Sequence, residues 1–165
     1  MPLMRCAFTG HRAKKLPWGY NERDPRCRDL KQRIYDTAEA VYSAGFDYFL
    51  CGMAEGCDLY FCEAVLALRS EHPEITIEAA VPFAGQADHW PKAERERYER
   101  LLSQCDKVTI LQEDYSPGCM MKRNRYMVDH TDLMIACYDG QTGGTLNTLR
   151  YALERNIRIL HLSIQ

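Results

Sequence analysis

The chain has 165 residues, the usual size of one domain, and its 21 basic and 23 acidic side chains leave a net charge of −2. A near-neutral chain has no overall electrostatic attraction to nucleic acid or to a membrane surface, which excludes classes of protein that depend on it. We expect a single domain over residues 1–165 with one binding or catalytic cleft.

Charge is nevertheless uneven along the chain. Residues 1–33 carry nine basic and three acidic side chains, while the remaining residues carry twelve and twenty. The sequence has no cationic leader followed by a long apolar segment, and no apolar run approaches about 18 residues, the length of a membrane helix. A cytoplasmic protein without membrane contact is therefore expected.

The eight cysteines are scattered and include no Cys-x-x-Cys pair. Cys51 and Cys137 lie in apolar runs, which favours reduced thiols packed in the core over a disulfide framework. Cys51 and Cys57 could be nucleophiles only beside a basic partner, so a structural role is favoured. The five histidines show no spacing typical of zinc sites, and no metal is expected.

Short apolar runs alternate with stretches of helical period along the chain. The runs have strand length and cover residues 4–9, 48–51, 75–81, 108–111, 133–138 and 157–162. Between them, apolar residues recur at three- and four-residue steps, which predicts five helices. Their markers are Leu30, Ile34, Ala38 and Val41, then Phe61, Ala64, Val65 and Leu68, the stretches 88–104 and 121–130, and Leu146, Leu149 and Leu153.

This alternation predicts an α/β domain with an open, mostly parallel sheet and helices on both faces, because parallel neighbours need a crossover connection. Near-continuous apolar strands agree with burial on both faces. In such sheets the ligand crevice lies at the carboxyl ends of the strands.

Small and polar residues collect at those carboxyl ends. They are Thr9-Gly10-His11-Arg12 after the first run, residues 52–58 after the second, residues 82–86 after the third and residues 139–145 after the fifth. We expect these four loops to form one site.

The last loop leads through Gly143, Gly144 and Thr145 into a helix. Glycines let the backbone approach a phosphate closely, and a helix N-terminus attracts anions. An ordinary glycine turn with Thr145 as the helix N-cap is the alternative. No Gly-Lys-Ser/Thr follows, so a P-loop is not indicated.

The loop after the second strand repeats the pattern with Gly52, Gly56 and Asp58. An acid here can bind ribose hydroxyls, although an acid in the first turn of a helix also stabilises that helix. The sequence lacks Gly-x-Gly-x-x-Gly, so a standard NAD hydride-transfer site is not indicated.

Three basic residues, Lys122, Arg123 and Arg125, occur near the start of the fourth helix. A guanidinium matches phosphate oxygens in two places at once. Arg125 is the candidate for this role, and Lys122 and Arg123 are expected on a solvated face.

Two further groups have both a functional and a structural interpretation. His11 could donate or accept a proton near neutral pH or pack as a loop residue. Trp90, with Phe83 and Gln86 before it, could wall a base pocket or belong to the core.

Six motifs carry a family resemblance. They are Phe8-Thr9-Gly10-His11-Arg12, Leu16-Pro17-Trp18-Gly19-Tyr20, Gly52-x-Ala54-x-Gly56-x-Asp58, Pro82-Phe83 with Gln86 and Trp90, Asn124-Arg125-x-Met127-Val128-Asp129, and Tyr138-Asp139-Gly140-x-x-Gly143-Gly144-Thr145. Together they resemble the YpsA-like family of the SLOG superfamily, named after the Smf/DprA and LOG proteins, over residues 5–160. Ala13 departs from the family's usual proline.

The resemblance implies a Rossmann-like sheet that binds a nucleotide or a nucleotide-derived ligand such as NAD or ADP-ribose. The implied ligand-binding residues lie at the strand ends and near the fourth and fifth helices. They are Thr9, Gly10, His11, Arg12, Gly52, Ala54, Gly56, Asp58, Pro82, Phe83, Gln86, Trp90, Asn124, Arg125, Asp139, Gly143, Gly144 and Thr145.

The leading hypothesis is a sensing or regulatory domain for such a ligand. LOG enzymes, which split a base from a ribose monophosphate, place a catalytic Glu where this chain has Thr148, and a hydroxyl cannot replace that carboxylate. The alternative is an N-glycosidic-bond hydrolase or transferase that uses Asp58, Asp139 or Glu55 instead.

Single-stranded DNA binding, by analogy with the Smf/DprA branch, is a further alternative. Its support is the basic segment 1–33, and basic residues of a first helix are usually solvated, so nucleic acid is not an expected partner. Related folds suggest a homodimer.

Overall fold

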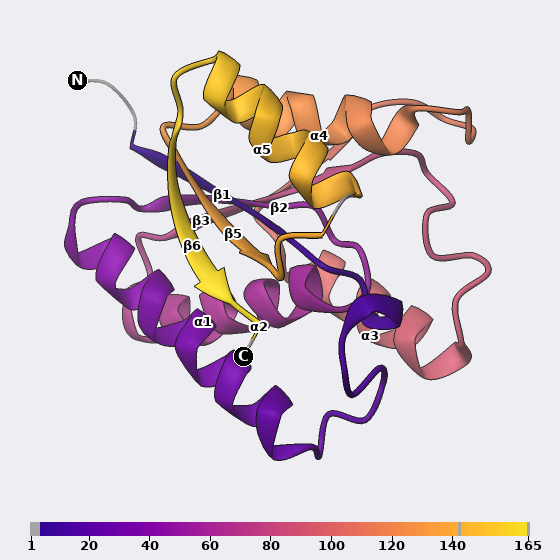
Figure 1. Ribbon diagram of the computed structural model, residues 1–165, viewed down its shortest axis with the longest axis horizontal. Helices are drawn as coiled ribbons and strands as arrows, with labels where there is room; N and C mark the ends of the chain where they lie inside the picture. Colours follow the sequence, from indigo (N-terminus) through magenta and orange to yellow (C-terminus); the bar gives the residue numbers. More distant parts are fainter. Residues whose placement is uncertain (1–3, 142, 165) are drawn as a thin grey trace.

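The computed structural model describes residues 4–141 and 143–164, in which strands and helices alternate along the chain (Figure 1). The strands are β1 (Arg5–Gly10), β2 (Tyr48–Cys51), β3 (Thr76–Val81), β4 (Lys107–Ile110), β5 (Leu133–Tyr138) and β6 (Arg158–Ser163). The helices are α1 (Pro25–Ser43), α2 (Cys57–Glu71), α3 (Lys92–Gln104), α4 (Cys119–Asp129) and α5 (Gly144–Glu154), with a short 3₁₀ helix, η1 (Ala13–Lys15), after β1.

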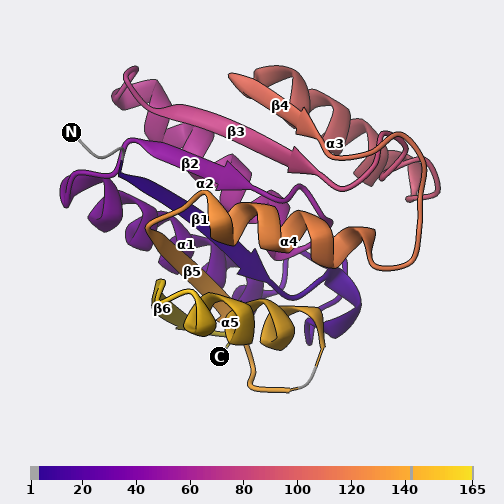
Figure 2. The ribbon, with the colours of Figure 1, turned by 90° about the horizontal axis from the view of Figure 1, so that it is seen from above.

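The strands form one sheet in the order β4-β3-β2-β1-β5-β6, and every pair is parallel (Figure 2). Successive strands run outward from β1 to β4, and then the chain returns to the other side of β1 to form β5. The order therefore reverses between β1 and β5, where the loops that leave the two strands diverge and open a crevice.

Helices cover both faces of the sheet: α1, α2 and α3 lie on one face and α4 and α5 on the other (Figure 1). Side chains alternate along β1, so that Phe8 faces the first layer and Ala7 the second. The Phe8 ring stacks on Phe61 of α2 at 4.5 Å between centroids. Opposite, Met127 of α4 and Leu149 of α5 pack over the sheet.

The predicted Rossmann-like α/β fold is confirmed. Three details differ from the sequence-based expectation. The third helix begins at Lys92 because Pro91 occupies its N-cap. β4 and β6 are edge strands that leave Ile110 and Leu160 exposed rather than buried. Leu153, expected on the apolar stripe of α5, is 64% exposed.

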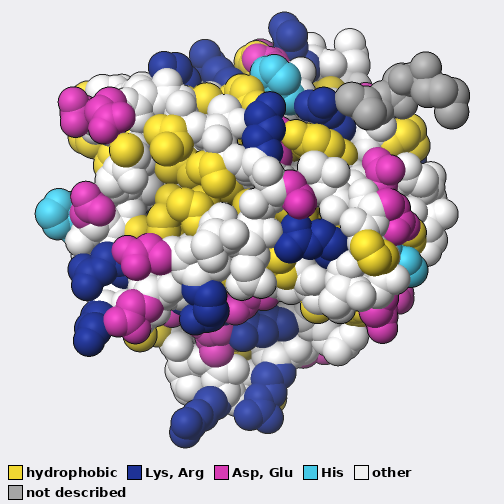
Figure 3. Space-filling view, turned by 180° about the vertical axis from the view of Figure 1, so that it is seen from behind, with side chains coloured by type: hydrophobic (Ala, Val, Ile, Leu, Met, Phe, Trp, Pro, Cys, Tyr) yellow, Lys and Arg dark blue, Asp and Glu magenta, His cyan; other side chains and the backbone are white. Residues whose placement is uncertain are grey.

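The surface opposite to the view of Figure 1 shows a patch of apolar side chains flanked by charged ones (Figure 3).

All eight cysteines are free thiols, and seven of them are buried. None of the helices in residues 4–141 and 143–164 is both long and apolar enough to cross a membrane.

Candidate functional site

A cavity of about 260 Å³ opens at the carboxyl edge of the sheet, where the strand order reverses between β1 and β5. Its walls come from the loop after β1, from η1, from the loop between β2 and α2, and from the first turns of α4 and α5. The lining residues are Thr9, Gly10, His11, Arg12, Lys14, Lys15, Ala54, Glu55, Asp58, Met120, Arg123, Asn124, Gly144 and Thr145.

His11 ties the loop after β1 to its neighbours. Its backbone N–H donates to Cys137 of β5 and its carbonyl accepts from Cys57 of α2, each at 3.1 Å. The buried imidazole Nε2 lies 2.8 Å from Oδ1 of Asp139. The hydrogen bond from His11 and that from the Gln141 backbone hold the pKa of Asp139 below its usual value. Asp139 therefore orients His11 from outside the cavity.

A buried acid and a buried guanidinium meet beneath the cavity at Gly52. Asp58 Oδ2 accepts from the Ala54 N–H at 3.2 Å, and Arg123 donates to the Gly52 carbonyl. A Cβ on Gly52 would lie 2.8 Å from Asp58 Oδ2 and 3.1 Å from Arg123 Nη1, so a side chain has no room there.

Burial shifts the pKa values of both Asp58 and Arg123. It raises the pKa of Asp58, against the opposing effect of Arg123, the Ala54 N–H and Arg12. Burial also lowers the pKa of Arg123, and the nearby Asp58 carboxylate opposes that change. Each charge is therefore sustained by the other in a site removed from water.

Cations and a helix N-terminus also line the cavity. Arg12, Lys14 and Lys15 supply the cations, and α5 contributes its N-terminus through Gly144 and Thr145. The N-cap of α5 is Gly143, which supplies no side-chain oxygen to the first amides of the helix. The alternative reading of Thr145 as the N-cap is therefore wrong. The amide groups at the start of α5 and these cations together suit an anion bound in the cavity.

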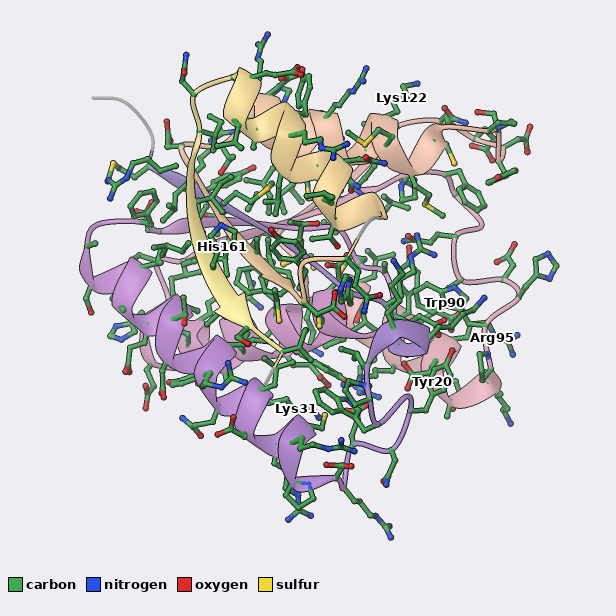
Figure 4. The ribbon with its side chains drawn as sticks, viewed as in Figure 1. Tyr20, Lys31, Trp90, Arg95, Lys122 and His161 are labelled. Atoms are coloured by element: carbon green, nitrogen blue, oxygen red, sulfur yellow. The ribbon has the colours of Figure 1, made fainter. Side chains whose placement is uncertain are left out.

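Glu55 brings a second carboxylate to the cavity. Its side chain accepts from the Tyr20 hydroxyl at 2.8 Å through Oε1. Burial and the carboxylate raise the pKa of Tyr20 to about 12. Figure 4 shows Tyr20 in the segment that follows η1, and Trp18 anchors that segment by donating to the Tyr60 hydroxyl at 3.2 Å.

Most of the expected residues gather at the cavity. Thr9, Gly10, His11, Arg12, Ala54, Glu55, Asp58, Asn124, Gly144 and Thr145 line it. Gly52, Gly56, Asp139 and Gly143 shape the loops around it. Gly56, with φ +91°, caps α2 so closely against the loop after β1 that a Cβ would lie 2.6 Å from the Ala13 nitrogen.

The residues after β3 lie elsewhere. Pro82 is buried at the strand end, and the Phe83 ring packs against Tyr115 in a separate cavity. Trp90, which is labelled in Figure 4, packs edge-on against Tyr98 of α3. Gln86 supports the cavity indirectly. Its side-chain amide donates to the Met53 carbonyl at 3.3 Å and so holds the loop before α2. An aromatic wall of the cavity is therefore not formed by Phe83 or Trp90.

In α4, Arg123 and Arg125 lie in the opposite places to those expected from the sequence. The Arg125 guanidinium lies over the Tyr151 ring at 5.1 Å, on the outside of the helix, whereas Arg123 is buried in the site. Arg123 is in phase with Cys119 and Met127, four residues to either side, on the buried face of α4. This helical period is the sequence signal that could have identified Arg123 as a buried residue. No comparable signal marks Lys14, Lys15 or Met120.

Thr148, which stands at the position of the LOG carboxylate, is fully buried. Its hydroxyl donates to the Gly144 carbonyl at 2.8 Å, within the first turns of α5. It therefore braces the helix whose N-terminal residues Gly144 and Thr145 line the cavity.

Comparisons with known proteins bear on the family and the fold of this chain. A family model described as the YspA SLOG family matches residues 6–159. The SPbeta prophage-derived protein YoqJ of Bacillus subtilis (strain 168) is 32% identical over 143 residues, which cover 79% of this chain and 84% of that protein. A UPF0398 protein of Bacillus pumilus (strain SAFR-032) is 26% identical, with 84% and 75% covered.

Two solved structures share the fold. DNA processing protein A from Helicobacter pylori superposes with a TM-score of 0.65 at 18% identity, and that from Streptococcus pneumoniae with 0.60 at 17%. Each match covers 96% of this chain, which spans only 64% and 50% of those two proteins. The Helicobacter protein is described as having a unique single-stranded DNA binding mode. This finding overturns the expectation that nucleic acid could be set aside as a partner.

Proposed function

The chain belongs to the YspA SLOG family, and on that premise we propose that it binds a nucleotide or nucleotide-derived ligand as a sensing or regulatory domain. The observation that carries the proposal is the cavity at the β1/β5 reversal, whose lining combines cations, the N-terminus of α5 and carboxylates.

The cations that line the cavity support a phosphate group on the ligand. Gly144 and Thr145 would donate backbone N–H groups to it, and Arg12 would neutralise it in the place first expected for Arg125. Thr9 and Asn124 offer neutral polar groups for the rest of the ligand. A molecule that carries both an anionic group and several hydroxyls fits this lining.

The size of the cavity supports a small ligand. A volume of about 260 Å³ lies just below the range of about 300–1,000 Å³ typical of pockets that bury drug-sized molecules. It suits one nucleotide or a sugar phosphate. A dinucleotide such as NAD or ADP-ribose would extend beyond it.

Isothermal titration calorimetry with a panel of nucleoside monophosphates, ADP-ribose and NAD tests the proposal. We expect Arg12→Ala to weaken binding by about tenfold or more, the usual effect of losing a hydrogen bond to a charged group. Arg125→Ala is the matched control and should leave binding unchanged. Absence of binding across the panel, or an equal loss in both variants, would contradict the proposal.

The engagement of Asp139 and Asp58, two of the three candidate catalytic acids, favours binding without turnover. Asp139 pairs with His11, and Asp58 is held beside Arg123 and the Ala54 N–H. Chromatography for free base after incubation with each nucleotide checks this. Base release that stops in Asp58→Asn would favour an N-glycosidic hydrolase instead.

Single-stranded nucleic acid binding is a second candidate. It is favoured by the likeness to DNA processing protein A and by the exposed cations Arg12, Lys14 and Lys15 at the cavity. A gel-shift titration with single-stranded DNA at increasing salt decides it, because phosphate contacts must weaken steeply as salt rises. No shift at low salt would reject this candidate.

A further inference from the structure

One carboxylate oxygen at the cavity is left without a partner. Glu55 is 9% exposed, and its Oε1 is occupied by the Tyr20 hydroxyl. Its Oε2 is shielded from solvent and receives no hydrogen bond from any residue that the structure describes. A buried acceptor in this state raises the free energy of the empty site, and a donor that reaches it recovers that cost.

The chemistry of the orphan oxygen limits what can satisfy it. An ionised carboxylate only accepts hydrogen bonds, so phosphate oxygens are excluded and the ligand must present an O–H or N–H group. Arg12, Gly144 and Thr145 supply the anion-binding groups of the same cavity. The ligand must therefore carry an anion and a hydrogen-bond donor close enough together to fit within about 260 Å³.

A ribose phosphate meets both conditions, because its 2′ and 3′ hydroxyls are the donors nearest to its phosphate. An exocyclic amine of the base lies farther from the phosphate, beyond the sugar. The small volume of the cavity, about 260 Å³, favours the donors closest to the phosphate, which are the sugar hydroxyls.

We propose that Glu55 Oε2 accepts a hydrogen bond from a ribose hydroxyl, so that the site selects ribonucleotides over their deoxy analogues. This inference rests on the proposed function and names the substrate class for the same site. Tyr20 acts as a positioning residue, since its hydroxyl holds Oε1, and Oε2 is the oxygen without a partner.

The test compares AMP with 2′-deoxy-AMP, 3′-deoxy-AMP and IMP by calorimetry. The wild type should bind at least one deoxy analogue about tenfold or more weakly than AMP, and IMP about as well as AMP. In Glu55→Ala and Glu55→Gln the difference between AMP and the deoxy analogue should shrink to about threefold or less. Glu113→Gln, an exposed change in the separate cavity beside Phe83, should retain the full difference.

Each other outcome has a definite meaning. Equal binding of AMP and both deoxy analogues by the wild type overturns the inference and leaves the proposed function intact. Full discrimination retained in Glu55→Ala also overturns it. Weak binding of IMP that depends on Glu55 assigns the oxygen to a base amine and refutes the ribose assignment. Failure of every nucleotide to bind overturns the proposed function itself.

A second measurement guards against misfolding. Because neutral Gln removes a buried charge, Glu55→Gln should melt no lower than the wild type in the absence of ligand. A lower melting temperature would show that Glu55 is already stabilised by the protein, which contradicts the unsatisfied oxygen.

Discussion

Gly52 shows how a single residue controls the floor of the cavity. Its missing side chain lets the Asp58 carboxylate and the Arg123 guanidinium approach the same backbone segment. Both side chains are buried, so neither can easily move away from an added atom.

We expect Gly52→Ala to destabilise the protein by about 1–3 kcal/mol, the usual cost of forcing an extra methyl group into a packed site. Gly144→Ala is the matched control, because no atom lies within 4 Å of its Cβ position, and it should change stability by about 0.5 kcal/mol or less. Urea unfolding measures both. Equal midpoints for the wild type and Gly52→Ala would show that the Asp58 and Arg123 side chains readily rearrange.

The site could be predicted from the sequence only in part at this scale. The loops that follow β1, β2 and β5 were found because glycines and polar residues directly follow apolar runs, as at Gly10 and Gly144. The exchange between Arg123 and Arg125 was missed because charge alone does not say which face of a helix is buried. The unsatisfied oxygen of Glu55 depends on where Tyr20 lies, and no local pattern encodes that contact.

At the scale of elements, a buried carboxylate holds β2, β3, β4 and α4 together. Glu78 of β3 accepts from the hydroxyls of Tyr48, Thr109 and Tyr126. Burial alone would raise its pKa, but these hydrogen bonds, led by that of Tyr126, lower the pKa of Glu78 below the ordinary value of 4.5. Its contribution to stability is therefore present above pH 4.5 and is lost as the pH falls through the lower folded value.

Tyr126→Phe should move the loss of stability in acid to higher pH, because the substitution removes one of the donors that lower the pKa of Glu78. Melting temperatures recorded between about pH 2 and pH 7 would report the shift, since acid destabilisation follows from such paired carboxylates. Tyr115→Phe, an exposed substitution, is the control. Superimposable profiles for wild type and Tyr126→Phe would count against a role for this hydrogen bond.

The elements themselves could largely be predicted from the apolar pattern. Runs of strand length and three- to four-residue periods identified every strand and α-helix of the described chain. The pattern did not separate edge strands from central ones, because Val108 and Ile110 are as apolar as buried residues. Their exposure follows from the sheet order, which is a property of the whole chain.

For the molecule as a whole, ligand binding is expected to stabilise the fold, because the cavity draws on segments from residue 9 to residue 145. A ligand at about 100 times its Kd adds about 2.7 kcal/mol, which corresponds to a rise of roughly 5–10 °C for a domain of this size. Differential scanning fluorimetry with AMP measures it. Arg12→Ala should reduce the rise, and an equal rise in both proteins would place the ligand elsewhere.

The sheet order also bears on how the protein is made. β1 is synthesised early and takes a central place, yet one of its two neighbours, β5, follows more than a hundred residues later: the Arg5 N–H bonds the Asp132 carboxylate across 127 positions. During translation β1 can pair with β2 but leaves its other edge open, and open strand edges favour aggregation. The cavity is completed only by Gly144 and Thr145 of α5, which follows β5, so a nascent chain gains its ligand site after the segment that covers this edge has been made.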